Sequence, residues 1–424
     1  MERMELLPNV YLTAVQTGKF KTAFLSVSLL TPLERQNASA NAILPPLLRR
    51  GSSRYPDMTR IQLRLDELYG ASLEPVVRRY GEMQSIGFCA EFCDERFLPE
   101  KPDMTGEMAA LLGEVLLHPN TRGGLFRQAW VESEKEKLAE RIDAQINDKR
   151  SYALSRLNEE MCCYEEYGTY ILGSRDSAEN LQYVSLSKHY KELLAVSPVE
   201  LFYCGSAETE RVADALYNAF LTLPRGEPDE ELGTDIRMNA VSEHVRSFEE
   251  ELDVSQGQLA LGFRLGECME EPDYPAIRVF NALFGGSAAS RLFRNVRETL
   301  SLCYYASSGV DLHKGILRVL SGVDFSKRQQ AQDEIIAQLE SIRSGISPQE
   351  LEDAKRSLIS AYRSVSDSPA ALEGYWLDQI LLGQDYDPAT YAALIENVSA
   401  ADVLTVANSV VWDAVYFLKG ERHD

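Results

Sequence analysis

This 424-residue sequence lacks the closely spaced histidine pairs from which many zinc sites are built. It holds five histidines, and no two of them lie within ten residues of each other: His118, His189, His244, His313 and His423. No HxxEH, HxxH or HxxxH spacing exists, so no single helix presents two imidazoles to one ion. We therefore expect no metal cofactor. Convergence of distant histidines with acids in space is the alternative that this spacing leaves open.

Patterns of other catalytic classes are missing as well. The sequence has no GxSxG, SxxK, GxGxxG or P-loop pattern, and no cysteine stands in a recognised protease context. The Gly-rich run FGGSAAS (284–290) lies inside a helical pattern and not between a strand and a helix start, which disfavours a phosphate cradle. The residue chemistry by itself thus predicts no catalytic group.

Basic residues are scarce relative to acidic ones. The chain has 43 Lys and Arg against 65 Asp and Glu, a formal net charge of −22. Such a field repels phosphate backbones and anionic membrane surfaces, so we expect neither nucleic acid nor a membrane as partner. The excess is typical of a solvated surface, and a preference for basic or neutral peptides is the sharper alternative.

Long apolar runs are absent too. No run reaches the roughly 18 uncharged apolar residues of a membrane span, and the N-terminal MERMELLPNVYL lacks the apolar core of a secretory signal. The seven cysteines are scattered without a CxxC pair, which is typical of reduced thiols. We expect a cytoplasmic protein.

One plan of strands and helices occurs twice along the chain. LDELYGASLEPVVRRYGEMQSIGFCAEF and VRETLSLCYYASSGVDLHKGILRVLSGVDF both read as helix end, strand, Gly-containing turn, strand and helix. A period of about 230 residues predicts a duplicated α+β domain. We expect an N-terminal domain at 1–190 and a C-terminal domain at 195–424, with PRGEPDEELGTD (224–235) as an internal loop of the latter.

Three further expectations concern single elements. LFYCG (201–205) reads as the first strand of the C-terminal domain, and 274–300 reads as one helix. Glu134, Glu136 and Glu140 alternate with basic residues, an interleaving typical of a solvated helix face.

The segment LFGGSAASRLFRNVRETLSLCYY (283–305) carries a specific resemblance. It resembles the C-terminal signature of the pitrilysin, insulysin and mitochondrial processing peptidase family, which reads as a Gly-rich helix of small residues, then SRLF, VRE and LGLCY or LGLAY. The duplicated plan is similar to the same family over nearly the whole chain. The resemblance implies two homologous metallopeptidase-like α+β domains that close like a clamshell around a peptide.

The resemblance also shows where a zinc site would be. Active members carry HxxEHxxxxG, and counting back from Gly51 puts the first histidine at Ala42, the general base at Pro45 and the second histidine at Pro46. All three functional residues are therefore replaced. Proline is tolerated in the first turn of a helix, so we expect the local helix to begin at Pro45 or to kink there.

The third zinc ligand of active members is a later glutamate. The segment EKEKLAERI (134–142) aligns with it at Arg141, or at Glu140 if the alignment slips by one. One carboxylate cannot hold a four-coordinate zinc, and without zinc and a base nothing delivers a hydroxide nucleophile. The chain alone is expected not to hydrolyse peptides.

The peptide-contacting residues of the C-terminal half are retained. The family pattern RExxGLxY maps onto Arg297 and Tyr304, with Ser301 in place of the glycine. By residue chemistry alone, Arg297 reads as a helix-end cation and Tyr304 as a half-buried strand aromatic.

In active members an edge strand of the N-terminal half pairs with the substrate backbone. The corresponding segment here is GASLEPVVRRY, where Pro75 would remove one hydrogen bond of that pairing. Protection of the edge from aggregation is the alternative reading of Pro75.

The resemblance implies a non-catalytic subunit that completes the peptide-binding site of a zinc-bearing homologous partner through Arg297 and Tyr304. LPPLLRRGSSRYP and LDELYGASL look most like a Gram-positive branch that lacks the zinc motif and is associated by name with modification of translation elongation factor P. Two alternatives remain. One is a homodimeric peptide-binding scaffold without proteolytic role, and the other is a divergent active peptidase.

Overall fold

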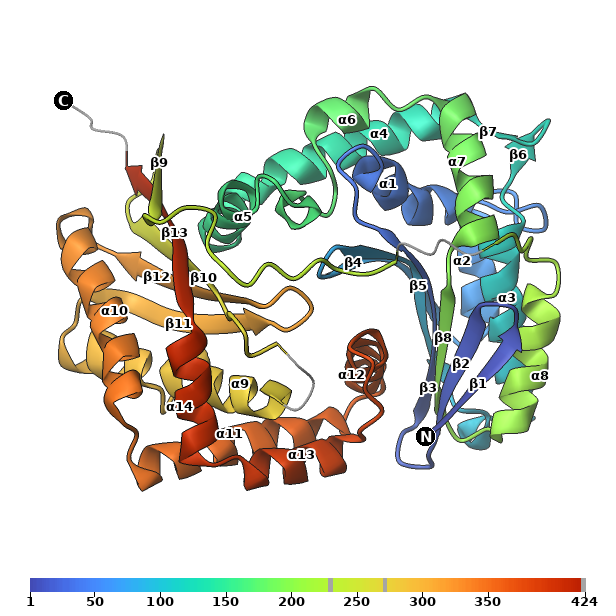
Figure 1. Ribbon diagram of the computed structural model, residues 1–424. Coiled ribbons are helices and arrows are strands. Elements are labelled where there is room, and N and C mark those ends of the chain that lie inside the picture. Colours follow the sequence, from blue (N-terminus) through green and yellow to red (C-terminus); the bar gives the residue numbers. More distant parts are fainter. Residues whose placement is uncertain (228–231, 270–272, 421–424) are drawn as a thin grey trace. The chain divides into compact units, whose positions relative to one another are not determined.

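The computed structural model describes residues 1–227, 232–269 and 273–420. The chain forms two compact units, and each unit is assembled from three stretches of sequence (Figure 1). The first unit comprises 1–143, 169–233 and 367–385, and the second comprises 144–168, 234–366 and 386–424. Each unit combines one main sheet with packed helices, which confirms the predicted α+β class.

The first unit is built on a six-stranded sheet in the order β1, β2, β8, β3, β5, β4. The strands are β1 (Glu2–Leu7), β2 (Val10–Gln16), β3 (Thr22–Pro32), β4 (Ser72–Tyr80), β5 (Met83–Cys93) and β8 (Val199–Gly205). β8 is buried along its whole length, and it lies parallel to β2 and antiparallel to β3. LFYCG was expected to open a domain at 195–424, but β8 pairs with β2 and β3 of the first unit, where both of its edges are hydrogen-bonded.

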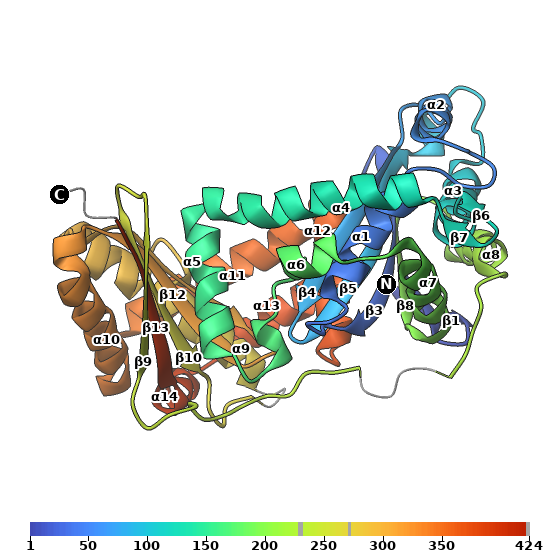
Figure 2. The ribbon, with the colours of Figure 1, turned by 90° about the horizontal axis from the view of Figure 1, so that it is seen from above.

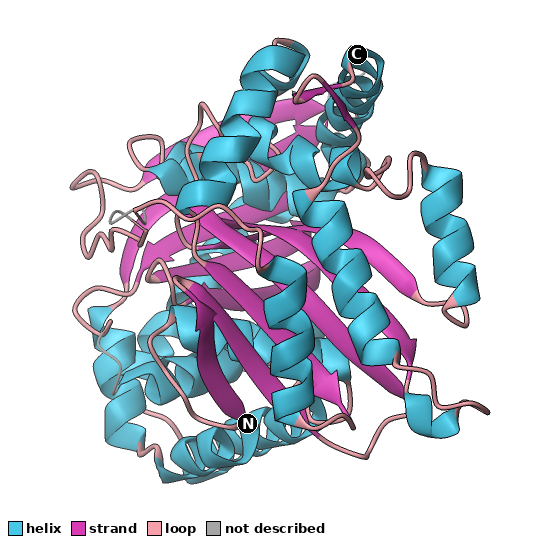
Figure 3. Cartoon of the chain, turned by 90° about the vertical axis from the view of Figure 1, so that its right-hand side faces the viewer, coloured by secondary structure: helices cyan, strands magenta, loops and turns pink. Residues whose placement is uncertain are grey.

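The two faces of this sheet differ in character. One face is apolar, with Leu12, Leu25, Val27 and Leu201 each at most 1% exposed. Helices cover it, as Figure 3 shows from that side. The helices that contact its strands are α1 (Ala38–Leu48), α3 (Met104–Leu117), α7 (Tyr183–Val196) and α8 (Thr209–Phe220). The remaining elements before β8 are α2 (Met58–Glu67), β6 (Thr121–Arg122), β7 (Leu125–Phe126), α4 (Gln128–Asp143) and α6 (Arg175–Glu179).

The opposite face of the first sheet is polar and carries helix α12 (Pro369–Leu381), which comes from late in the sequence (Figure 1). Glu373 anchors this helix although it is only 1% exposed. Its carboxylate accepts hydrogen bonds from Arg78 at 2.6 and 2.8 Å and from the Ser26 hydroxyl at 3.2 Å. A buried charge is stable only when it is paired and hydrogen-bonded, so these contacts fix α12 on the sheet.

The second unit is built on a five-stranded sheet in the order β11, β12, β10, β13, β9. The strands are β9 (Arg246–Leu252), β10 (Gly257–Arg264), β11 (Cys303–Asp311), β12 (Ile316–Val323) and β13 (Val411–Gly420). Helices that follow in this unit are α9 (Tyr274–Asn281), α10 (Arg328–Ser344), α11 (Pro348–Val365), α13 (Pro388–Asn397) and α14 (Ala400–Ser409). None of the described helices of the chain combines the length and apolar character that crossing a bilayer requires.

Helix α5 (Lys149–Met161) belongs to this second unit although it precedes β8 in sequence. Figure 2 shows it on one side of the sheet, with α10 on the other. Leu157 and Met161 pack against β10, where Gly262 makes room, since a Cβ there would lie 2.4 Å from the Met161 sulfur. The segment 144–168 therefore completes the core of the second unit.

A buried ionic network fixes the end of that segment. The carboxylate of Glu165 accepts from Arg264 at 2.7 and 3.0 Å and pairs with Lys314 at 2.8 Å. Asp413 pairs with Arg264 at 2.9 Å and with Arg246 at 2.7 Å. The side chains of Arg264 and Lys314 are 0% exposed, and the carboxylates of Glu165 and Asp413 contribute to the compensation of this buried charge.

The expected single helix over 274–300 is interrupted. α9 continues as the π-helical segment η5 (Ala282–Gly286), the chain extends at Ser287 with φ −139° and ψ 163°, and a second π-helical segment, η6, spans Leu292–Thr299. Gly285 allows η5 to pack closely against β11, because a Cβ at this position would lie 2.7 Å from the backbone nitrogen of Ser308. The Gly-rich run thus permits close approach of this segment to the edge strand.

Candidate functional site

The positions of the zinc motif lie within helix α1. Ala42 and Pro45 are buried and Pro46 is half-buried. The helix runs from Ala38 to Leu48 with both prolines inside it, so the expected start at Pro45 is wrong. Neither proline can donate a backbone hydrogen bond within the helix, and neither supplies a metal ligand.

The polar side chains around α1 are bonded to one another. The Asn41 amide donates to Gln84 at 2.8 Å, and its oxygen lies 2.6 Å from His189 Nε2. Gln84 in turn donates to the Ile171 carbonyl at 2.7 Å. Burial lowers the pKa of His189, so its imidazole is neutral at pH 7. This cluster joins α1 to β5 and α7, and within the described parts of the chain no group of His, Cys, Asp and Glu is arranged to hold a metal ion.

Helix α4 contains the two candidate positions for the third ligand. Glu140 and Arg141 are both exposed. The buried carboxylate of this helix is instead Glu134, which lies 3.0 Å from Arg50 and 2.8 Å from Lys137. Glu134 and Lys135 are 5% and 8% exposed, so the interpretation of this stretch as a wholly solvated face is wrong. An ion pair with Arg50, at the end of α1, accounts for the burial of Glu134.

The edge strand β4 is obstructed as a template for an added strand. Arg49 Nε donates to the Leu73 carbonyl at 2.5 Å, so this carbonyl points away from β5. Backbone groups alternate along an antiparallel strand, and residue 75 therefore faces the same open edge. That residue is Pro75, which has no N–H to offer. An extended peptide would lose one acceptor and one donor at this edge.

The structure places Arg297 and Tyr304 in the second unit, on η6 and β11. The Arg297 side chain is 41% exposed, stacks over the Phe293 ring at 4.7 Å and lies 3.5 Å from Glu298. Tyr304 is 61% exposed and sits at an irregularity in the pairing of β11 with β12. Its hydroxyl donates to Asp324 at 3.1 Å, a bond that raises the pKa of Tyr304. Both side chains are thus accessible from solvent, and neither is engaged with the other by a hydrogen bond in the described residues.

Ser301 adopts a backbone conformation that favours glycine. Its φ is +49°, in the left-handed region, and its carbonyl accepts from Lys327 at 3.2 Å. The family glycine at this position therefore has a physical reason.

We expect Ser301→Gly to raise the free energy of unfolding by roughly 0.5–1 kcal/mol, because relief of strain exceeds the added entropy of the unfolded chain. Urea denaturation measures this change. Ser360→Gly, in the interior of helix α11, is the control and is expected to destabilise. Equal destabilisation by both substitutions would contradict the assignment of strain at Ser301.

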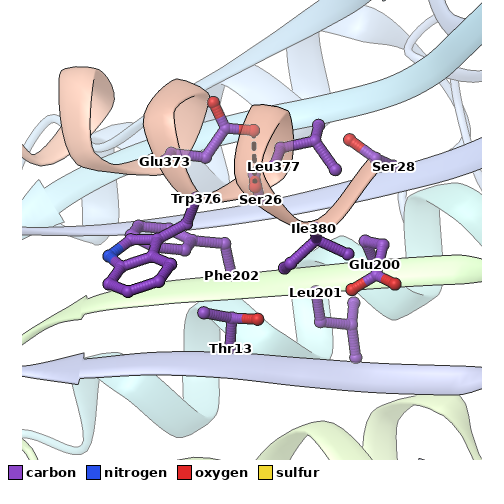
Figure 4. A pocket seen from close by; sticks show the side chains of 10 residues that line it. All are labelled: Thr13, Ser26, Ser28, Glu200, Leu201, Phe202, Glu373, Trp376, Leu377 and Ile380. Atoms are coloured by element: carbon purple, nitrogen blue, oxygen red, sulfur yellow. Dashed lines mark hydrogen bonds between the residues drawn. The ribbon is translucent and has the colours of Figure 1, made fainter. Parts of the chain in front are cut away.

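A small cavity with polar and apolar lining residues lies under α12 on the first sheet (Figure 4). Its volume is about 10 Å³, room for about one water molecule. Glu200 Oε2 and Thr13 Oγ1 face it without a hydrogen-bond partner among the described residues, while Glu200 Oε1 accepts from Arg3 at 2.5 Å. Burial raises the pKa of Glu200 to about 7, although Arg3 opposes the shift. Sequence reasoning missed this carboxylate because VELFYCG reads as an ordinary buried strand.

Comparison with known proteins finds similarity to peptidases and to inactive peptidase homologues, in both sequence and structure. A family profile described as "Peptidase M16 inactive domain" matches residues 180–358. The "Probable inactive metalloprotease YmfF" of Bacillus subtilis is 32% identical over 409 residues, 96% of this chain and 95% of its own length. The "Uncharacterized zinc protease YmxG" of the same organism is 32% identical over 147 residues, 33% of this chain and 35% of its own. A crystal structure of a conserved protein from Enterococcus faecalis V583 is 28% identical with a TM-score of 0.88, covering 100% of this chain and 99% of that one.

Proposed function

This chain belongs to the peptidase M16 family, and we propose that it serves there as a non-catalytic subunit that completes the peptide-binding site of a zinc-bearing homologue. The names of the family profile and of YmfF, both "inactive", support the non-catalytic part. One observation carries the proposal. Ala42, Pro45 and Pro46 occupy the metal-binding positions, whereas Arg297 and Tyr304 remain exposed on the other unit.

The surroundings of Arg297 and Tyr304 suit contact with a bound peptide. Among the described residues, the Phe293 ring and a longer contact to Glu298 hold Arg297, so reorienting it toward a peptide carbonyl or carboxylate costs little. A charge-assisted bond to such a group is short and strong. The Tyr304 hydroxyl donates to the exposed Asp324 carboxylate, and by turning away from Asp324 it can donate to a developing oxyanion.

Two further observations support a partner of the same family and a reducing location. Bacillus subtilis contains both a relative named as probably inactive and one named as a zinc protease, so the two kinds of chain occur in one organism. All seven cysteines of this chain are free thiols, which fits the cytoplasm. An open reading frame with HxxEH beside the gene would favour the heteromer.

The test is peptide cleavage by this chain mixed with the HxxEH-bearing relative from its own organism. We expect Arg297→Ala and Tyr304→Phe each to lower kcat/KM of the pair about 10- to 100-fold, because each removes a donor to the peptide or oxyanion. Arg356→Ala and Tyr164→Phe are matched controls, since these side chains are 75% and 79% exposed elsewhere in the second unit.

Complex formation is measured in parallel by light scattering, so that loss of activity is separated from loss of assembly. Unchanged kcat/KM in an intact complex of either variant would exclude the proposed site-completing role. A chain that forms only homodimers and leaves the activity of its relative unchanged would favour the scaffold alternative.

A further inference from the structure

The second unit holds a pocket that the proposed roles of Arg297 and Tyr304 do not use. It has a volume of about 420 Å³ and lies between the first turns of α5 and the hairpin of β11 and β12. Arg150 and Ser151 line it from the helix, and Ser307, Gly309 and Arg318 line it from the strands. A pocket of this volume accommodates a small ligand or one terminal residue of a peptide.

Arg150 is exposed and Arg318 is half-buried, and both differ in their partners from three other arginines of the unit. Arg264, Arg246 and Arg291 each pair with a carboxylate at 2.7 to 2.8 Å. In contrast, neither Arg150 nor Arg318 forms an ion pair with any described residue.

Arg150 and Arg318 make contacts with aromatic side chains in place of the ion pairs of those three arginines. The Arg150 guanidinium lies 3.9 Å from the centroid of the Tyr305 ring. The Arg318 guanidinium is hydrogen-bonded to Tyr167, but its buried Nε has no partner within the described chain. A buried donor without an acceptor is costly, so an acceptor from outside the chain fits this position.

The nearby carboxylates are already satisfied by other donors. Asp148 accepts from the backbone of Arg150 at 3.1 Å and from the backbone and hydroxyl of Ser151 at 3.3 and 2.6 Å. These bonds with Ser151 lower the pKa of Asp148, so it is ionised at neutral pH. Asp311 accepts from Tyr167 at 2.8 Å and from the His313 backbone at 3.1 Å. Neither acid therefore neutralises the pocket arginines by a direct bond.

The pocket also has an open floor. A Cβ built on Gly309 would meet no heavy atom within 4 Å. Gly309 pairs with Arg318 across the two strands, so the space above the glycine lies beside the guanidinium. A ligand can therefore approach Arg318 at close range.

We propose that this pocket binds a carboxylate group, supplied by the C-terminus of a peptide or by a free dicarboxylate. Two guanidiniums with the hydroxyl of Ser307 match the planar, bidentate acceptor geometry of a carboxylate. Asp148 lines the same pocket and offsets one of the two guanidinium charges, so the lining suits one carboxylate group, whereas phosphate brings two charges to the same point. The peptide source, though not the carboxylate site, rests on the proposed function.

Binding to the full-length chain is measured by fluorescence anisotropy with a labelled mixture of random nonapeptides that end in a free carboxylate. The same mixture ending in a carboxamide, sodium succinate and inorganic phosphate are the comparison ligands, the last two added as competitors. We expect the free acid to bind at least 10-fold more tightly than the amide, or succinate to bind if the source is a dicarboxylate, and phosphate to compete poorly.

Three variants locate the site. Arg150→Gln and Arg318→Gln are each expected to weaken binding about 10-fold or more, and Arg356→Gln is the exposed control. Gly309→Val places a branched side chain in the space beside the Arg318 guanidinium without changing charge, so it is expected to weaken binding about 10-fold or more even if an arginine variant folds poorly. Gly374→Ala is its control, since a Cβ there also meets no atom within 4 Å.

The outcomes separate this proposal from the site-completing role. Equal binding of acid and amide with no competition by succinate would overturn the carboxylate site, as would stronger competition by phosphate or unchanged binding by Gly309→Val. None of these results bears on the cleavage assay with the zinc-bearing relative, and failure of that assay leaves succinate binding to be tested.

Discussion

Glu165→Gln is expected to lower the free energy of unfolding by about 3–5 kcal/mol, the cost of removing one member of a buried ion pair. Glu165 compensates Arg264 and Lys314, whose side chains are both 0% exposed. These two cations lower the pKa of Glu165 although burial opposes that shift. Once the charge of Glu165 is removed, Asp413 is the one described carboxylate that remains bonded to Arg264, and Asp413 is shared with Arg246. The substitution therefore leaves buried positive charge uncompensated.

Urea denaturation gives the size of this effect, and hydrogen exchange gives its location. Exchange is expected to accelerate in α5 and β10, because Glu165 ties the segment 144–168 to the second sheet. Glu267→Gln is the matched control, an exposed glutamate of the same unit with an expected change within about 0.5 kcal/mol. Equal stability of the two variants would show that the network contributes no net stabilisation.

The stability of the chain is expected to fall as pH rises from about 5 to 8, through the titration of Glu200. The folded pKa of about 7 lies above the ordinary value of 4.5, so the folded state holds a proton that the unfolded chain has already released. The stabilisation is complete below about pH 4.5 and is lost as pH rises through 7. A difference of about 2.5 in pKa corresponds to on the order of 3 kcal/mol.

Comparison with Glu200→Gln isolates this contribution, because the variant has no proton to release. The difference in unfolding free energy between the natural chain and Glu200→Gln should decrease between pH 5 and 8, as measured by urea denaturation at each pH. Glu136→Gln, at an exposed position of α4, should give a difference that does not change with pH. A pH-independent difference for Glu200→Gln would mean that the cavity solvates the ionised carboxylate.

The parts of the fold that were predictable are those with strong local patterns. The two hairpins β4–β5 and β11–β12 were evident from alternating residues on either side of a turn, and Gly81 and Gly315 have φ of +58° and +67°. Gly51, from which the zinc motif was counted, has no space for a side chain, since a Cβ would lie 2.7 Å from the Pro56 carbonyl. Steric restriction limits these positions to glycine, so the turns and close contacts that they mark can be predicted from the sequence.

The parts that were not predictable depend on contacts between distant segments. The exchange of 144–168 and 367–385 between the units leaves no local signal, because amphipathic helices do not specify which sheet they cover. The interior prolines of α1 suggested a helix start, but packing of the surrounding buried residues overrides the local cost of proline. Glu134 and Glu200 looked solvated or unremarkable because their cationic partners, Arg50 and Arg3, lie far away in sequence.

We propose that this chain binds no zinc of its own and acts through a zinc-bearing relative. The direct measurement is zinc content and peptide hydrolysis for the purified chain, for its HxxEH-bearing relative and for the two together. We predict less than stoichiometric zinc and no hydrolysis for the chain alone, and hydrolysis by the pair above the sum of the separate rates. One zinc per chain with hydrolysis by the chain alone would contradict the account.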